Sequence, residues 1–183
     1  MAEHTPVPGR ECGPCIACCQ HLTIDDPQLK KLPGVLCRHC RVGQGCGIYE
    51  RRPSDCQTYY CGWRMLPGFD DAWRPDRSQV MMELRPPPEG YSGHAIAFNL
   101  IGDLQVVRET RFVETISSLV ARGVAVYLLV PGKPGHVSGK IFLNDGLKPS
   151  VDARDVEETR KQLGLAMEAG VQIEKKPLVF GEQ

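Results

Sequence analysis

The stretch CGPCIACC, residues 12–19, decides how the N-terminal third of this chain folds. It begins a segment from Cys12 to Cys61 that holds all nine cysteines of the 183-residue sequence. Thiols separated by two residues, as they are here, can be presented to one metal ion by a single tight turn. The adjacent pair Cys18 and Cys19 is expected to send its side chains in different directions. This pattern indicates two metal sites, or one cluster with an additional site.

The first ten residues, MAEHTPVPGR, contain no apolar core that would serve as a secretory signal. We therefore expect a cytoplasmic protein with reduced cysteines, because disulfides persist mainly in oxidising compartments. Clustered thiolates in such a protein indicate zinc, copper(I) or iron–sulfur ligation. Zinc and an iron–sulfur cluster both accept all-sulfur ligands. Zinc is the first choice, because a thiolate-rich module with few core residues needs a metal to fold.

Charge and hydropathy argue against several kinds of partner. The chain has 22 Lys and Arg residues against 22 Asp and Glu residues, so no overall field would attract nucleic acid or an anionic membrane. No apolar run reaches the roughly 18 residues that span a bilayer. Metal ions are the expected partners and a protein partner is compatible with the sequence, whereas a membrane or nucleic acid is not expected.

The composition of the chain changes near residue 78. Residues 1–77 are rich in Cys, Pro, Gly and Arg, which is typical of a small module whose metal replaces much of the hydrophobic core. Residues 78–183 contain the longer apolar patterns of regular secondary structure. We expect a cysteine-rich metal-binding module over residues 1–77 and an α+β domain over residues 78–183 packed against it.

The second part is predicted to be a mixed sheet with about two helices on one face. Apolar periodicity predicts helices over residues 110–122 and 152–169, each followed by a glycine suited to end a helix. Turns are expected at Gly102-Asp103 and Asp145-Gly146. Strands are predicted over residues 79–84, 95–101, 104–107, 124–130 and 137–143, with a short last strand at 178–180.

The order of the cysteines resembles that of a known family. After CxxCxxCC come a later cysteine and the run GCGIYERRPSDCQTYYCGW, residues 45–63. This order is similar to that of the YkgJ-like cysteine-cluster family, described as zinc- or iron-chelating CxxCxxCC proteins, and WRPDRS at residues 73–78 resembles a bacterial subgroup of it. The resemblance covers about a third of the chain. It implies that the metal ligands are Cys12, Cys15, Cys18, Cys19, Cys37, Cys46, Cys56 and Cys61.

Several residues near this pattern have a less defined role. Cys40 is an extra thiol, and we consider it as a ninth ligand, an exchanging ligand or a free thiol. His21 and His39 lie beside cysteines, but thiols are plentiful, so we expect these imidazoles near the site rather than on the metal. Arg52, followed by Pro53, is expected to fix a turn by bonding backbone carbonyls or sulfurs.

Three functions fit these patterns. The first is a metal-binding protein with a structural or adaptor role. The second is an iron–sulfur enzyme of redox or methyl-transfer type, which would explain the excess of thiols and the extra Cys40 but has no recognisable cofactor pocket in the sequence. The third is a zinc-dependent nucleic-acid-binding module that uses the aromatic residues near the cysteines for stacking. We predict the first, and do not expect an enzyme, because the chain has no dinucleotide fingerprint, phosphate loop or nucleophile elbow.

Overall fold

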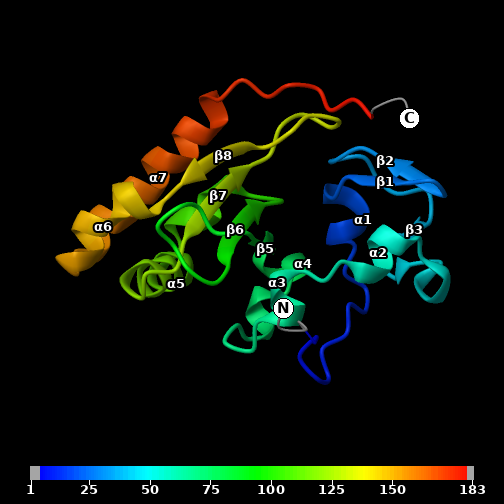
Figure 1. Ribbon diagram of the computed structural model, residues 1–183, viewed down its shortest axis with the longest axis horizontal. Coiled ribbons are helices and arrows are strands. Elements are labelled where there is room, and N and C mark those ends of the chain that lie inside the picture. Colours follow the sequence, from blue (N-terminus) through cyan, green and yellow to red (C-terminus); the bar gives the residue numbers. More distant parts are fainter. Residues whose placement is uncertain (1–4, 181–183) are drawn as a thin grey trace.

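A computed structural model describes residues 5–180 and confirms the α+β class (Figure 1). Its main sheet has four strands in the order β5-β6-β7-β8. The central pair β6 and β7 is parallel and the two outer pairs are antiparallel, so the sheet is mixed, as predicted. The strands are β5 Val80–Arg85, β6 Ala95–Leu100, β7 Val126–Val130 and β8 Gly139–Phe142.

The two faces of this sheet differ, because successive side chains of a strand point to opposite faces. In β6, Phe98 and Leu100 belong to the main hydrophobic core. Ala97 and Asn99, which alternate with them, line a groove on the other face. One face of the sheet is therefore apolar and packed, and the other carries polar groups.

Helices α5 and α7 pack against the apolar face (Figure 1). Helix α5, Thr110–Ala121, matches the helix predicted over residues 110–122 and connects the two parallel strands. Helix α7, Val156–Gln172, begins later than predicted, because the Asp155 carboxylate caps it by accepting a hydrogen bond from the Glu158 amide. Within residues 5–180, no helix has the length and apolar character needed to cross a membrane.

The turn predicted at Asp145-Gly146 is wrong, because these residues lie inside helix α6, Asn144–Asp152. The sequence gives little sign of this helix, which contains both a glycine and Pro149. The Asn144 side chain bonds the backbone of the segment leading into β7, with distances of 2.8 Å to Val126 N and Val124 O. Tertiary contacts thus stabilise a helix that local propensity disfavours.

The strand predicted over residues 104–107 is also wrong. This segment is the 3-10 helix η3, Leu104–Arg108, and the Asp103 carboxylate accepts a hydrogen bond from Gln105 N at its start. A short apolar run fits either helical or strand spacing. The cap formed by Asp103 therefore decides that this segment is helical. Residues 178–180 do not form the predicted strand; beside them there is an isolated bridge between His136 and Pro177.

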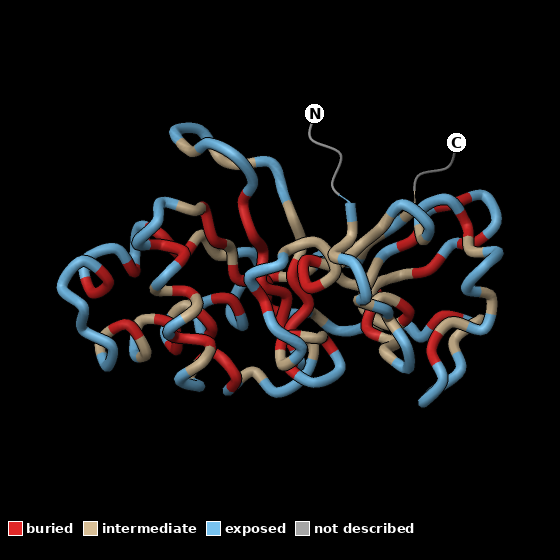
Figure 2. Tube along the Cα trace, turned by 90° about the horizontal axis from the view of Figure 1, so that it is seen from below, coloured by how far each residue is buried: buried red, intermediate tan, exposed pale blue. Residues whose placement is uncertain are grey.

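The N-terminal part consists of short elements around a small second core (Figure 2). Its buried apolar members are Cys19, Ile24, Leu29 and Cys37. Such a small core provides little stability by itself. The elements are α1 Ala17–His21, β1 Ile24–Asp26, β2 Leu29–Lys31, β3 Cys40–Arg41, β4 Gly45–Cys46, η1 Tyr49–Arg51, α2 Ser54–Thr58, α3 Gly62–Met65, η2 Asp71–Trp73 and α4 Pro75–Ser78.

Aromatic residues from the end of this part enter the main core. Trp63, Phe69 and Trp73 are buried in it, and the Trp73 ring lies edge-on to Phe98 of β6 with centroids 5.8 Å apart. A Cβ atom on Gly62 would lie 2.6 Å from the Met82 Cβ, so α3 packs directly on β5. The main core therefore extends across residue 77, where the composition changes.

Candidate metal centre

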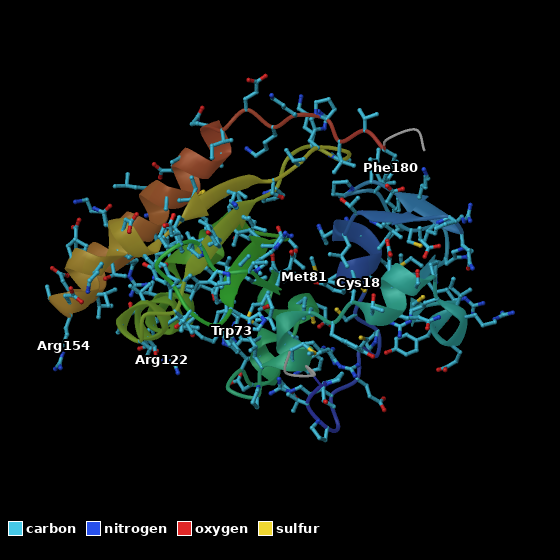
Figure 3. The ribbon with its side chains drawn as sticks, viewed as in Figure 1. Cys18, Trp73, Met81, Arg122, Arg154 and Phe180 are labelled. Atoms are coloured by element: carbon cyan, nitrogen blue, oxygen red, sulfur yellow. The ribbon has the colours of Figure 1, made fainter. Side chains whose placement is uncertain are left out.

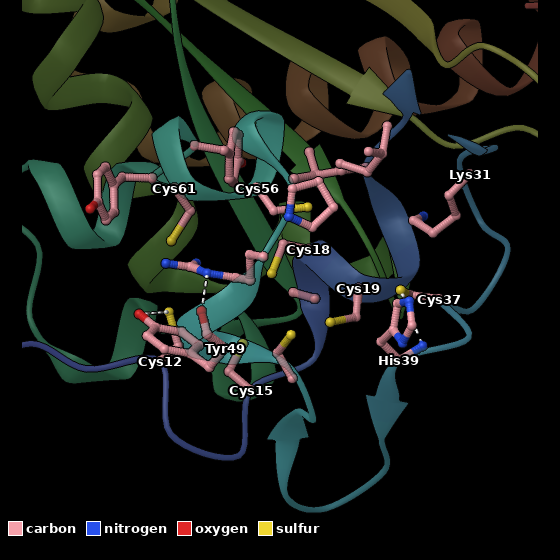
Figure 4. A pocket seen from close by; sticks show the side chains of 18 of the residues that line it. Cys12, Cys15, Cys18, Cys19, Lys31, Cys37, His39, Tyr49, Cys56 and Cys61 are labelled. Carbon is pink, nitrogen blue, oxygen red and sulfur yellow. Dashed lines mark hydrogen bonds between the residues drawn. The ribbon is translucent and has the colours of Figure 1, made fainter. Parts of the chain in front are cut away.

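Eight cysteines from separate elements line one cavity in the N-terminal part (Figure 4). The cavity has a volume of about 80 Å³, several times the roughly 10–15 Å³ that one water molecule requires. Its cysteines are the eight positions that the family resemblance implies, namely Cys12, Cys15, Cys18, Cys19, Cys37, Cys46, Cys56 and Cys61. Residues far apart in the sequence thus bring their thiols to one place.

Backbone hydrogen bonds form the turns that carry these thiols. Cys15 N donates to Cys12 O at 3.1 Å, and Cys40 N donates to Cys37 O at 2.9 Å. These two of the three CxxC spacings therefore make tight turns, as the sequence predicts. Cys37 N also donates to Cys19 O at 2.9 Å, which joins the second turn to helix α1.

A glycine allows the β3–β4 hairpin to approach the first turn. Gly45 has a φ of +96°, and a Cβ atom there would lie 2.5 Å from the Gly13 carbonyl oxygen. Only a residue without a side chain permits this contact and this backbone conformation. The close approach places the next residue, Cys46, at the cavity.

The thiols fall into two groups. The inner group surrounds the small core and consists of Cys18, Cys19, Cys37, Cys40, Cys46 and Cys56. The outer group is Cys12, Cys15 and Cys61. Two polar side chains lie beside the outer group. The Arg64 Nη1 atom is 3.7 Å from Cys12 Sγ, and the Tyr49 hydroxyl oxygen is 4.0 Å from the same sulfur. Of this group, Cys61 packs against the main core.

Cys40 belongs to the inner group but is not among the residues that line the cavity. It is the register partner of Cys46 in the β3–β4 hairpin. A side-chain hydrogen bond also connects it with Cys19. The extra thiol of the sequence pattern is thus placed beside two of the predicted ligands.

The adjacent thiols of Cys18 and Cys19 line the same cavity and share a hydrogen bond. This bond lowers the pKa of Cys18 and raises the pKa of Cys19, because the accepting sulfur is stabilised as a thiolate while the donor retains its proton.

Burial raises the pKa of other thiols in the cluster. The pKa values of Cys15 and Cys56 are each raised to about 11, chiefly by desolvation. The pKa values of Cys40 and Cys61 are raised for the same main reason. Because a metal binds the thiolate, it must displace the protons that these groups hold at neutral pH.

Three cationic side chains line the cavity, and no Asp or Glu does so among the residues described. They are Lys31, Arg52 and Arg64. Lys31 is 5% exposed, and its ammonium donates to the carbonyl oxygens of Gln20, Leu32 and Val35 at 3.2, 3.1 and 3.1 Å. Burial lowers its pKa, while the nearby thiols oppose this effect. Positive charges that line the cavity favour the thiolate form of its cysteines.

The structure shows where the arginine, histidine and lysine residues near the cysteines lie and what they contact. Arg52 bonds a backbone carbonyl, as predicted, with its Nε 2.9 Å from Tyr49 O. His39 lines the cavity, whereas His21 lines the groove on the sheet. The sequence pattern did not identify Lys31 as a residue that lines the cavity. The alternation of burial along β2 places it inside, but a strand of three residues gives too short a pattern to show this.

The donor chemistry of the cavity fits a soft or borderline metal, but the sulfur atoms do not form a closed site. Within residues 5–180, no three His, Cys, Asp or Glu side chains are grouped so that they could hold one ion. Binding therefore requires the thiols to move inward. The Arg64 Nε atom and the Tyr59 hydroxyl are buried, and neither has a hydrogen-bond partner among residues 5–180. Such groups are usually satisfied by something else bound nearby.

Comparison with known proteins adds no assignment. No family profile, curated protein or solved structure gives a significant match to this chain. The likeness to the YkgJ-like family therefore stays a prediction that rests on the cysteine motif alone.

Proposed function

We propose that this protein binds metal through its cysteine cluster, with zinc as the first choice, and that the metal stabilises the N-terminal part. The observation that carries the proposal is the lining of one cavity by eight thiols, with no carboxylate among its described residues. Thiolates favour zinc, copper(I) and iron–sulfur clusters over hard cations such as magnesium and calcium.

A structural role explains the size of the N-terminal core. Four buried apolar residues, two of them cysteines, form its centre, and the surrounding helices and strands are at most five residues long. A metal bound to thiols from several of these elements supplies the cohesion that burial of so little apolar surface does not.

The two groups of thiols correspond to two binding regions. The inner group, including Cys40, offers enough sulfur ligands for one tetrahedral ion, and the outer group with a neighbouring inner thiol offers enough for a second. Lys31, Arg52 and Arg64 would offset the negative charge of the bound thiolates. Arg64, whose Nη1 lies 3.7 Å from Cys12 Sγ, would also donate a hydrogen bond to sulfur.

An iron–sulfur cluster is the alternative occupant, because the same thiols suit it. In that case the protein would belong to the redox or methyl-transfer class. The apolar character of the inner core is compatible with both occupants. Metal identity is therefore the measurement that separates the two functions.

The test is anaerobic purification of the full chain, followed by elemental analysis, acid-labile sulfide determination and a visible absorption spectrum. We expect a colourless protein with about two zinc ions per chain. The double variant Cys18→Ser/Cys19→Ser is expected to lose zinc, and Lys30→Met, at an exposed residue nearby, to retain it. Iron with sulfide would establish the alternative, and a metal-free, folded protein would rule out both.

A further inference from the structure

A groove of about 1020 Å³ separates the polar face of the main sheet from the N-terminal part. This size lies at the upper end of the range for small-molecule sites. Its walls include His21 and Leu22 of the cysteine module, residues of all four sheet strands, and Leu178 of the C-terminal segment. The ribbon shows the β7–β8 connection and this segment passing above the space between the two parts (Figure 1).

The groove is distinct from the cysteine cavity but adjoins it. Leu22, Tyr59 and Tyr60 line both spaces. Met81 of β5 lines the cysteine cavity together with Cys18, and both lie where the sheet meets helix α1 (Figure 3). A ligand in the groove would therefore be separated from the thiols by a wall of side chains.

Asn99 is the first sign that this groove has an occupant. It lies on the central strand β6, is 8% exposed and lines the groove, and no hydrogen bond of its carboxamide is recorded among the described residues. Its full hydrogen-bonding capacity is therefore available to a ligand that enters the groove. The Tyr59 hydroxyl in the same wall is also buried without a recorded partner. Both groups are suited to bond a polar ligand.

The charges around Asn99 indicate the sign of that ligand. Arg85 and Lys140 line the groove, and Glu83 is its only described carboxylate. Arg85 pairs with Glu83, but Lys140 lies over the Tyr127 ring at 4.8 Å, with no carboxylate recorded against it. The excess of cations favours an anion. Apolar residues such as Leu129 and Val137 line the remaining wall and favour a ligand with an apolar body.

We propose that this groove binds a small organic carboxylate with an apolar body. Its carboxylate would pair with Lys140 of β8, and a polar group beside it would bond the Asn99 carboxamide, which lies in the same cross-strand row of the sheet. The apolar body would lie along Leu129 and Val137. This site does not depend on the metal and goes beyond the proposed function.

The test uses the full-length protein with its metal content measured. 3-Phenylpropionate is the probe, and its neutral analogue 3-phenylpropanamide is the matched control, with binding followed by calorimetry and by amide NMR shifts. We expect the carboxylate to shift resonances of groove residues on β6, β7 and β8, and the amide to bind about tenfold more weakly. Absence of carboxylate binding, or equal binding of the amide, would overturn the proposal.

Variants separate a ligand site from a structural feature. Lys140→Met is expected to weaken binding about tenfold. Lys148→Met, at a lysine paired with Asp152 on helix α6, is expected to leave it unchanged. Unchanged affinity in the Lys140 variant would contradict the proposal. All variants should retain the parental metal content, so the result is independent of the metal-binding proposal.

The variant Asn99→Leu tests whether the Asn99 carboxamide binds a ligand or stabilises the fold. If the carboxamide serves a ligand, replacing it with an apolar side chain of similar size should weaken binding without lowering the melting temperature, because no internal hydrogen bond is lost. A lower melting temperature with unchanged ligand affinity would instead show that Asn99 is structural.

Discussion

At the scale of single residues, Lys31 links the cysteine cavity to the backbone that surrounds it. Its ammonium bonds three carbonyl groups and faces the cavity. Lys31→Met would leave these carbonyls without their partner and remove a buried positive charge. We expect the free energy of unfolding to fall by about 2 to 3 kcal/mol, measured by urea denaturation of the metal-loaded protein.

The neighbouring Lys30 is a matched control. Its side chain is half exposed and pairs with Asp25 across the β1–β2 hairpin. Exposed ion pairs contribute little, so Lys30→Met should change the free energy of unfolding by less than about 1 kcal/mol. Equal losses for the two variants would show that the buried contacts of Lys31 are unimportant.

Cys40 is the thiol whose role the sequence leaves open. Because it contacts Cys19 and pairs with Cys46, we expect it to take part in metal binding. Cys40→Ser should lower the amount of zinc that survives dialysis against a competing chelator, as Cys18→Ser should. Full retention of zinc by the Cys40 variant would identify it as a free thiol.

The raised thiol pKa values predict how stability changes with pH in the metal-free protein. Cys15 and Cys56 have a pKa of about 11 in the folded chain, against 9.0 for an unperturbed thiol. The unfolded chain therefore loses these protons first as the pH rises. The folded state binds more protons between these values, so its stability falls with increasing pH.

We expect the free energy of unfolding of the metal-free protein to decrease from pH 9 to 11, as measured by urea titration at a series of pH values. The zinc-loaded protein should show a weaker dependence, because its ligating thiols are already deprotonated. A flat profile for the metal-free protein would contradict the burial of these two thiols.

At the scale of elements, the β3–β4 hairpin depends on Gly45. Gly45→Ala would place a methyl group 2.5 Å from the Gly13 oxygen, so the hairpin must shift away from the Cys12–Cys15 turn. Gly43→Ala is the control, since its φ is also positive but open space surrounds it. The control should cost about 1 kcal/mol from backbone strain alone.

We expect Gly45→Ala to lower both thermal stability and zinc content more than Gly43→Ala does. The physical reason is that the first variant combines backbone strain with a clash against another backbone segment. Similar zinc contents in the two variants would indicate that the hairpin and the first turn need not touch for metal to bind.

Secondary structure was predictable where a periodic apolar pattern extended over many residues. It was not predictable where the apolar run was only a few residues long. The periodicity of α5 extends over three turns, and the prediction there is confirmed. The four-residue run at 104–107 fits two spacings, and its strand prediction is wrong. Helix α6 contains Gly146 and Pro149, so only its packing against α5 and α7 explains why it forms.

At the scale of the whole molecule, the two cores predict two levels of stability. The main core contains the large aromatic cluster, whereas the second consists mostly of cysteines and a few aliphatic residues. Removing metal with a chelator should therefore destabilise residues 12–61, so that they open far more often, while the main sheet survives. Hydrogen exchange followed by mass spectrometry would show loss of protection in the first region and retention in β6 and β7.

Trp63 and Trp73 refine this prediction, because they belong to the main core although they precede residue 78. Their amides should remain protected in the chelated protein. Unchanged exchange over the whole of residues 12–61 after metal removal would show that the N-terminal core does not need a metal.

The sequence by itself determined the cysteine-rich segment, its tight turns, the strands of the main sheet and the helix between the parallel strands. These features depend on spacing and turn chemistry within a few residues. Only the tertiary structure decided which thiols share a cavity, why Lys31 and Arg64 face it, and how a polar sheet face and the cysteine module form a groove. Those features depend on packing between residues far apart in the chain, which local patterns do not encode.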